Sequence, residues 1–149
     1  MNSMNIKIHK LHDQAIKPQK STEGSAGYDL HACLDDDVII NSMERKLIST
    51  GLVFEVPYGY EAQIRGRSGL SIKNGITVLN SPGTIDSDYR NEVKVILINF
   101  STNTFVVKNG MRIAQMLICK LLNYDFHFVS FEELSESKTR SGGFGSTDI

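Results

Sequence analysis

Hydrophobic residues alternate with polar residues along most of the chain, or they gather in short apolar runs bounded by glycine, proline and asparagine. Alternation with a period of two residues is typical of β-strands. The pattern predicts strands within residues 5–11, 45–56, 60–65, 75–80, 92–101, 104–110, 112–122 and 126–131. Eight or more short strands separated by turn residues indicate an all-β chain, built as an antiparallel sandwich, jelly roll or barrel.

Two segments require a choice between helix and strand. Residues 67–75 predict one short helix, in which Ser68 is the candidate N-cap and Gly75 the candidate terminator. Residues 112–122 fit helical spacing about as well as strand spacing, and the β-rich context favours a strand. The apolar runs at 95–99 and 115–118 require cover on both faces, which predicts contacts between subunits.

Length and charge narrow the class of protein. A chain of 149 residues predicts one domain. Its net charge of -1, from 16 Lys+Arg and 17 Asp+Glu, provides no bulk field, so we expect neither nucleic acid nor a membrane as a partner. Cys33 and Cys119 lie far apart without metal-binding spacing, and no signal peptide or membrane-spanning run is found. We therefore expect a reducing, cytoplasmic setting, two buried thiols and no protein-ligated zinc.

Five polar, glycine-rich stretches are candidates for functional loops: residues 26–32, 66–71, 80–92, 110–115 and 138–149. In the second stretch, Arg67, Ser68 and free backbone N–H groups at a helix start suit a phosphate. A capping serine beside a solvated arginine would give the same pattern. The last stretch, read by itself, has the composition of a disordered terminus.

The third stretch contains Asp86 and Asp88, which would point to opposite faces of an extended segment. Asp86 follows the apolar Ile85 where the chain leaves a strand, so we expect its carboxylate to be partly desolvated, as suits a general base. A turn that caps a hairpin is the alternative. With Asp29 as a helper carboxylate and several phosphate donors, the stretches together suggest nucleoside triphosphate chemistry with phosphate-bound Mg²⁺.

The stretches "AGYDL", "GRSGLS", "GTIDSDYR", "GMRIAQ" and "RSGGFGST", in this order across residues 26–147, closely resemble the five motifs of the trimeric dUTPases. The resemblance implies a jelly-roll β subunit over residues 1–137 and a flexible C-terminal lid over residues 138–149. It also implies a homotrimer whose active sites are shared by the three subunits. The implied reaction is Mg²⁺-dependent hydrolysis of dUTP to dUMP and pyrophosphate, by water attack on the α-phosphorus.

The resemblance also implies roles for individual residues. Asp86 resembles the base that activates the water, and Asp29 resembles the carboxylate that holds waters on Mg²⁺. Uracil and deoxyribose would be bound by Asn80, Gly83, Thr84, Ile85, Tyr89 and Phe144. The phosphates would be bound by Arg67, Ser68, Gly69, Gln115, Arg140, Gly145, Ser146 and Thr147. Within this scheme Tyr89 excludes a 2′-hydroxyl, and Phe144 stacks over the uracil.

Two residues depart from the family pattern. Met111 stands where an aspartate is common, which puts the orientation of Arg112 and the subunit contacts in question, and Asn91 stands where a glycine is common. Two other functions share part of the pattern. One is a dCTP deaminase or bifunctional relative, and the other is a regulatory module that binds dUTP. The complete fifth motif favours hydrolysis over the first, and Asp86 favours catalysis over the second.

Overall fold

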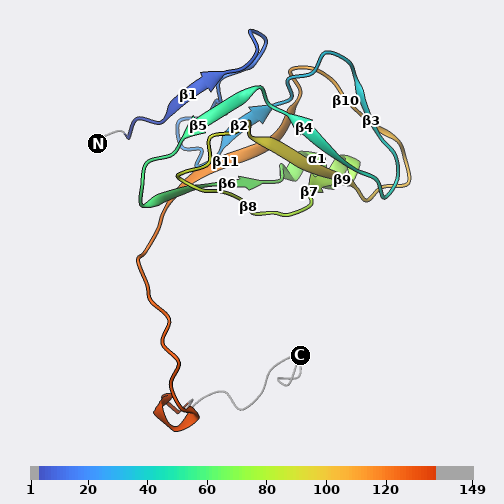
Figure 1. Cartoon of the computed structure of the whole chain (residues 1–149). Helices are drawn as coiled ribbons and strands as arrows, with labels where there is room; N and C mark the ends of the chain where they lie inside the picture. Colours follow the sequence, from blue (N-terminus) through green and yellow to red (C-terminus); the bar gives the residue numbers. More distant parts are fainter. Residues whose placement is uncertain (1–3, 137–149) are drawn as a thin grey trace.

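Residues 4–136 are described by the structure, a computed structural model, and they form eleven β-strands, one α-helix and one 3₁₀-helix (Figure 1). The strands are β1 (Lys7–Lys10), β2 (Tyr28–His31), β3 (Val38–Ile40), β4 (Arg45–Ser49), β5 (Leu52–Glu55), β6 (Tyr60–Arg65), β7 (Ile76–Val78), β8 (Gly83–Ile85), β9 (Lys94–Asn99), β10 (Phe105–Val107) and β11 (Arg112–Lys120). The helices are α1 (Ser68–Asn74) and the 3₁₀ turn η1 (Phe131–Glu133).

The strands are arranged in two larger and two smaller antiparallel sheets. One larger sheet has the order β2-β11-β6-β8 and the other has the order β4-β9-β7, while β1 pairs with β5 and β3 with β10. Both larger sheets contribute to a single hydrophobic core, whose members include Leu30, Ala114, Met116, Ile48, Val95 and Leu97. The all-β, jelly-roll-like class expected from the periodicity is confirmed.

Strand β11 lies in the middle of the four-stranded sheet, between β2 and β6. Its side chains alternate, so that Ala114 and Met116 are buried in the core while Gln115 between them points to the other face. A helix over these residues would not pair with two neighbours along its length. The expectation of a strand at 112–122, rather than a helix, is confirmed.

Helix α1 follows β6 and ends at Gly75, as expected. Gly75 adopts a left-handed backbone with φ of 66°, and its N–H bonds to the carbonyl oxygens of Leu70 and Ser71. The expected N-cap role of Ser68 is wrong. Arg67 is the extended residue that occupies the N-cap position. Ser68 is already the first helical residue, so its hydroxyl is not at the position from which an N-cap side chain accepts hydrogen bonds from the first turn.

Three strands of the structure were not predicted as strands from the sequence pattern. β2 and β8 lie within the first and third glycine-rich stretches, and β3 was not predicted. Each has only three or four residues, which is too short for alternation to be recognised. Their identity as strands comes from the neighbours with which they pair, β11, β6 and β10.

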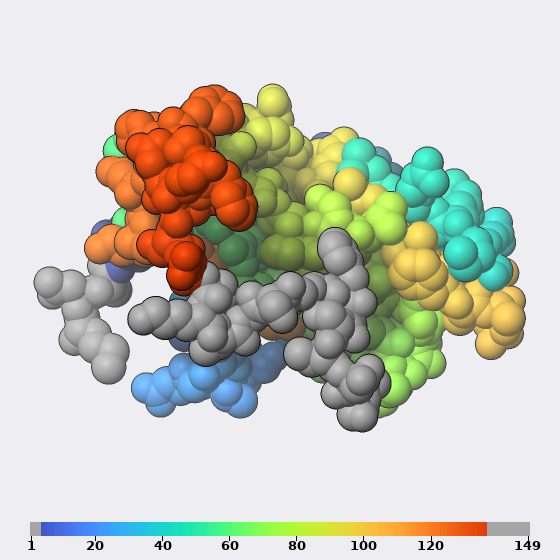
Figure 2. Space-filling view, turned by 90° about the horizontal axis from the view of Figure 1, so that it is seen from below, coloured from blue at the N-terminus to red at the C-terminus, as the bar shows by residue number. Residues whose placement is uncertain are grey.

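The strand predicted at residues 126–131 is wrong for the single chain. After β11 the chain leaves the sheets as an extended arm, residues 121–130, which runs away from the strand body and ends in η1 (Figure 1). Figure 2, seen from the end towards which the arm projects, shows it as an orange-red lobe in front of the strands. Leu122, Tyr124, Phe126 and Phe128 alternate with polar residues there, but strands form by pairing, and no strand within residues 4–136 pairs with them.

A tight turn between β4 and β5 gives a test of the fold. Gly51 has φ of 66°, and a Cβ there would lie 2.9 Å from both Ala15 Cβ and Cys33 Sγ. Gly59 has φ of 81° with open space around it. We expect Gly59→Ala to cost about 1 kcal/mol through backbone strain. Gly51→Ala should cost about 1–3 kcal/mol more, because it also overpacks the core.

The measurement is denaturant-induced unfolding of both variants at equal protein concentration, followed by circular dichroism. Because both positions need a left-handed backbone, Gly59→Ala serves as the matched control for strain. Equal losses of stability in the two variants would contradict the packing of Gly51 against Ala15 and Cys33.

Candidate active site

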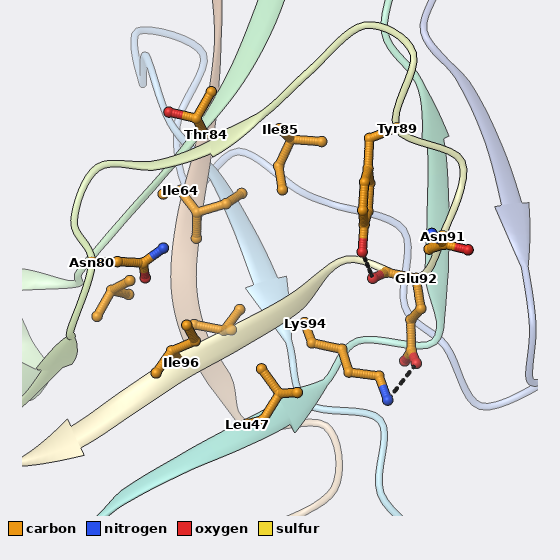
Figure 3. A pocket seen from close by; sticks show the side chains of 13 residues that line it. Leu47, Ile64, Asn80, Thr84, Ile85, Tyr89, Asn91, Glu92, Lys94 and Ile96 are labelled. Carbon is orange, nitrogen blue, oxygen red and sulfur yellow. Dashed lines mark hydrogen bonds and ion pairs between the residues drawn. The ribbon is translucent and has the colours of Figure 1, made fainter.

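A pocket of about 380 Å³ lies between the hairpin at residues 80–92 and the β4-β9-β7 sheet (Figure 3). It is lined by Leu47, Ile64, Val78, Asn80, Gly83, Thr84, Ile85, Tyr89, Asn91, Glu92, Lys94, Val95 and Ile96. The walls are mostly apolar, and Asn80 offers both an amide donor and a carbonyl acceptor. Such a pocket suits a flat heterocycle that is read by a few polar groups.

The hairpin brings together most of the residues expected to bind the nucleoside. Asn80, Gly83, Thr84, Ile85 and Tyr89 all line the pocket. At Gly83 a Cβ would lie 3.2 Å from Asn80 Nδ2, so glycine at this position leaves space for the Asn80 amide.

The ring of Tyr89 stands at one end of the pocket, and its position is fixed by hydrogen bonds. The hydroxyl donates to the main-chain carbonyl of Glu92 at 3.0 Å (Figure 3). The backbone N–H of Tyr89 donates to the carbonyl of Asp86 at 3.2 Å, which closes the turn. A fixed ring at the mouth of a nucleoside pocket is suited to contact a sugar face.

Asp86 directly follows β8 and is exposed, and it is not among the residues that line the pocket. The expected partial desolvation of its carboxylate is therefore wrong for the single chain. Ile85 before it is only partly buried, so this copy of the hairpin does not shield the carboxylate from water. Any desolvation must be supplied by something that binds over the hairpin.

A second polar cluster is centred on Asp29, whose side chain is 12% exposed. Arg67 Nε donates to Asp29 Oδ1 at 3.0 Å, and Arg112 Nη1 donates to Asp29 Oδ2 at 3.2 Å. Ser21 Oγ also donates to Oδ2 at 3.2 Å. Two arginines around one carboxylate leave a net charge of +1, which favours an anion such as phosphate.

His31 is the titratable residue beside this cluster, and its pKa decides whether a third positive charge lies there. Burial lowers the pKa of His31, and the charges of Arg112 and Arg67 lower it further, against an opposing effect of Asp29. The imidazole is therefore neutral at neutral pH and adds no third cation beside Asp29. Within residues 4–136 its buried Nδ1 has no hydrogen-bond partner.

The expected phosphate loop lies beside the Asp29 cluster. Arg67 belongs to that cluster, and Ser68 and Gly69 are exposed at the start of α1. Gln115 Nε2 donates to the carbonyl of Gly66 at 3.1 Å, which connects β11 to the loop. The sequence therefore identified these neighbours, but it gave no indication that Asp29 would be held by both Arg67 and Arg112.

The nucleoside pocket and the Asp29 cluster use opposite faces of the four-stranded sheet. Residues paired across antiparallel strands share a face. Asp29 is paired with Gln115, and Gln115 with Arg65, on one face. The core face carries the next set of partners, Tyr28, Met116, Ile64 and Gly83. One copy of the chain therefore does not bring the two candidate subsites into one cavity.

The two residues that depart from the family pattern lie within the described part of the chain. Met111 is partly buried and packs against the hydrophobic core, and Arg112 still reaches Asp29. Asn91 lines the pocket and is not among the residues with positive φ in the described part of the chain. Arg112 thus keeps its contact with Asp29 although Met111 precedes it.

Several expected features are not part of the structural description. The whole lid at 138–149 lies outside the described residues, and with it Arg140, Phe144, Gly145, Ser146 and Thr147.

Between residues 4 and 136, no three His, Cys, Asp or Glu side chains are placed to hold a metal. In the same range Cys33 is buried, Cys119 is half-buried, and neither forms a disulfide.

Comparison with known proteins identifies the class of this chain. The family profile described as dUTPase matches residues 13–148. The deoxyuridine 5'-triphosphate nucleotidohydrolase of Nautilia profundicola is 54% identical over 144 residues, which cover 97% of this chain and 99% of the relative. The protein of the same name from Rickettsia akari is 50% identical over 153 residues, with full coverage of both chains. The chain belongs to the dUTPase family, and it is an enzyme of the nucleotide hydrolase class.

Solved structures agree with the fold. A dUTPase of Staphylococcus bacteriophage 80alpha, solved with dUPNHPP, matches with a TM-score of 0.86 at 22% identity, covering 99% of this chain and 100% of that one. A dUTPase from phage phi11 of S. aureus, described with a structural Mg(II) ion, matches with a TM-score of 0.77 at 20% identity, covering 87% of this chain and 99% of that one.

In the described part of this chain, no helix has the length and apolar character needed to span a membrane.

Gly27 gives a test of the link between β2 and Gln115. A Cβ at Gly27 would overlap Oε1 of Gln115, whereas Gly24 has open space around it. We expect Gly27→Ala to displace the Gln115 amide and to weaken binding of a non-hydrolysable dUTP analogue roughly tenfold, the effect of one hydrogen bond to a charged group. Gly24→Ala should bind as the parent does. Isothermal titration calorimetry measures both, and unchanged binding by Gly27→Ala would show that Gln115 does not contact the ligand.

Proposed function

We propose that the protein hydrolyses dUTP to dUMP and pyrophosphate, which limits uracil in DNA and supplies dUMP for thymidylate synthesis. The observation that carries the proposal is the pocket under the hairpin, where Asn80 and Tyr89 line a cavity of nucleoside size. Family membership supplies the reaction class. We place the enzyme in the cytoplasm, where its substrate would be found.

The pocket accounts for selection of both base and sugar. The Asn80 amide and the backbone of the hairpin would pair with the polar edge of uracil, and cytosine presents the opposite donor pattern at position 4. Ile64 and Ile85 close the apolar side of the pocket, so a methyl group at C5 would meet side chains. Tyr89 would lie under the deoxyribose and leave no room for a 2′-hydroxyl.

The Asp29 cluster would bind the triphosphate. Arg67 and Gln115, with backbone groups of Ser68 and Gly69, would donate hydrogen bonds to phosphate oxygens. The lid at 138–149 would close over the ligand, where Arg140, Gly145, Ser146 and Thr147 contact phosphate and Phe144 covers the uracil. The net positive charge of the cluster supports this assignment.

The donor set fits a Mg²⁺ ion carried by the triphosphate rather than one held by a protein cage. Asp29 is the carboxylate nearest the phosphate loop, and its remaining lone pairs would accept hydrogen bonds from metal-bound waters. When bound, the metal would neutralise charge on the phosphates.

Asp86 would act as the general base. Its carboxylate would accept a proton from a water molecule as the water oxygen bonds to the α-phosphorus. The bond from that phosphorus to the bridging oxygen then breaks, and pyrophosphate leaves with the electron pair. Because Asp86 is exposed in one chain, its desolvation would come from the ligand, the lid or a neighbouring copy.

A homotrimer with shared active sites would bring the two subsites together. The nucleoside pocket and the Asp29 cluster lie on opposite faces of one sheet, so two copies must contribute to one complete site. Apolar surface supports association. The arm exposes Tyr124, Phe126 and Phe128, while a groove of about 530 Å³ includes residues of β1 and the segment before it. That groove is lined mainly by apolar side chains, including Ile6, Ile8, Tyr28, Phe54, Met116 and Ile118.

The arm of one copy would fit the groove of another by strand addition, which supplies the pairing that the arm lacks in a single chain. We expect Phe126→Ala with Phe128→Ala to shift the protein from trimer towards monomer, because the apolar face of the arm is lost. Asn123→Ala with His127→Ala changes the alternate face and should leave the trimer intact. Sedimentation velocity measures both, and a stable trimer in the first variant would contradict this role.

The reaction is tested by pyrophosphate release from dUTP, with dTTP, dCTP and UTP in parallel, in Mg²⁺ and after chelation. We expect Mg²⁺-dependent release from dUTP alone. The variant Asp86→Asn should lose turnover, by about a hundredfold or more as expected for a general base, while it still binds the dUTP analogue. Uracil products formed from dCTP would indicate a deaminase, and full turnover by Asp86→Asn would reject its role as the base.

A further inference from the structure

The side chain of Glu92 joins the end of the hairpin to the turn between β4 and β5. Its Oε1 accepts a hydrogen bond from the backbone N–H of Gly51 at 2.8 Å, and its Oε2 pairs with Lys94 Nζ at 3.3 Å. The Glu92 side chain is only 15% exposed, although it belongs to a loop. A nearly buried carboxylate with two partners is a fixed point rather than a solvated surface charge.

The residues around this contact make the anchor rigid. The N–H of Val93 donates to the carbonyl of Leu52 at 2.9 Å, and Thr50 Oγ1 donates to the carbonyl of Val93 at 2.6 Å. Thr50 and Val93 are fully buried. The chain at residues 92–93 is therefore tied to the 50–52 turn by side-chain and backbone hydrogen bonds together.

The Tyr89 hydroxyl is bonded to this anchored segment. It donates to the main-chain carbonyl of Glu92, so the ring takes its position from the residue that the Glu92 carboxylate fixes (Figure 3). We infer that Glu92 is a positioning residue that sets the discrimination between deoxyribose and ribose, by holding the Tyr89 ring against the sugar. This inference rests on the proposed function.

The physical reason is that steric exclusion depends on the stiffness of the excluding group. A ring that can move by a fraction of an ångström admits a 2′-hydroxyl, whereas a ring anchored to a packed turn must distort the core to do so. Glu92 belongs to the pocket wall, but its hydrogen bonds within residues 4–136 go to Gly51, Lys94 and Tyr89, not to the Asn80 amide or the Asp29 cluster. Its effect should therefore appear in sugar selection rather than in the chemical step.

The test compares kcat/KM for dUTP and UTP in the full-length protein. We expect the dUTP-to-UTP ratio to fall roughly three- to tenfold in Glu92→Ala, the effect of one misplaced hydrogen bond. Most of the change should be a gain with UTP. Glu92→Gln keeps an oxygen acceptor for Gly51 and should retain most of the discrimination. Glu55→Ala removes an exposed carboxylate paired with Lys7, which is not among the residues that line the pocket, and should match the parent.

A second variant tests the same connection without touching Glu92. Tyr89→Phe removes the hydroxyl and should lower the ratio to a similar extent. The double variant of Tyr89→Phe and Glu92→Ala should lower the dUTP-to-UTP ratio little further, because both changes break the same linkage between the ring and the turn. If Glu92→Ala does not fold, Tyr89→Phe and Glu92→Gln still decide the question.

The outcomes separate this inference from the proposed function. An unchanged ratio in Tyr89→Phe, or an equal loss for both nucleotides in Glu92→Ala, overturns the positioning role and leaves dUTP hydrolysis intact. Failure of the parent protein to release pyrophosphate from dUTP would instead reject the proposed function. A dUTP-to-UTP ratio that is lowered in Glu92→Ala but close to the parent value in Glu92→Gln supports the inference.

Discussion

The register of β11 is the constraint on which both candidate subsites depend. Gln115 lies opposite Asp29 on one side and Arg65 on the other, while the adjacent Met116 lies opposite Tyr28 and Ile64. A slip of one residue would exchange the two faces, so that the polar cluster would enter the core. The buried side chains of Ala114 and Met116 oppose such a slip, because it would bring Gln115 into an apolar interior. Core packing thus determines where Asp29 and Gln115 lie.

Two glycines and two carboxylates connect the sheets to the loops around them. Gly27 leaves the space that the Gln115 amide occupies, and Gly51 allows the turn that receives the Glu92 carboxylate. Asp29 holds Arg67 and Arg112, which come from the loop before α1 and from the start of β11. Each contact joins segments far apart in the sequence. The loops are therefore positioned by the rigid sheets, as is usual where binding residues stand on a β scaffold.

The sequence pattern predicted long strands such as β9 and β11, because their apolar runs extend over six to nine residues. It did not predict β3, β2 or β8, which are short and take their structure from pairing partners. The motifs located the pocket residues Asn80, Ile85 and Tyr89, since these share one hairpin. The contact of Glu92 with Gly51 could not be predicted, because it joins residues 41 positions apart through a single side chain. The exposure of Asp86 was missed because desolvation depends on what covers the hairpin, and the sequence of one copy does not specify that.

The arm and the exposed Asp86 have the same physical explanation. A period-two pattern with aromatic side chains at Tyr124, Phe126 and Phe128 has the composition of a strand, yet an isolated segment has no ladder to join. The exposed Asp86 carboxylate likewise has no low-dielectric surroundings among the described residues of one copy. Both features look incomplete when the single chain is considered by itself, and both become consistent if a second copy covers them. Association would then complete a sheet edge and an active site through the same contact, so that catalytic competence would depend on assembly.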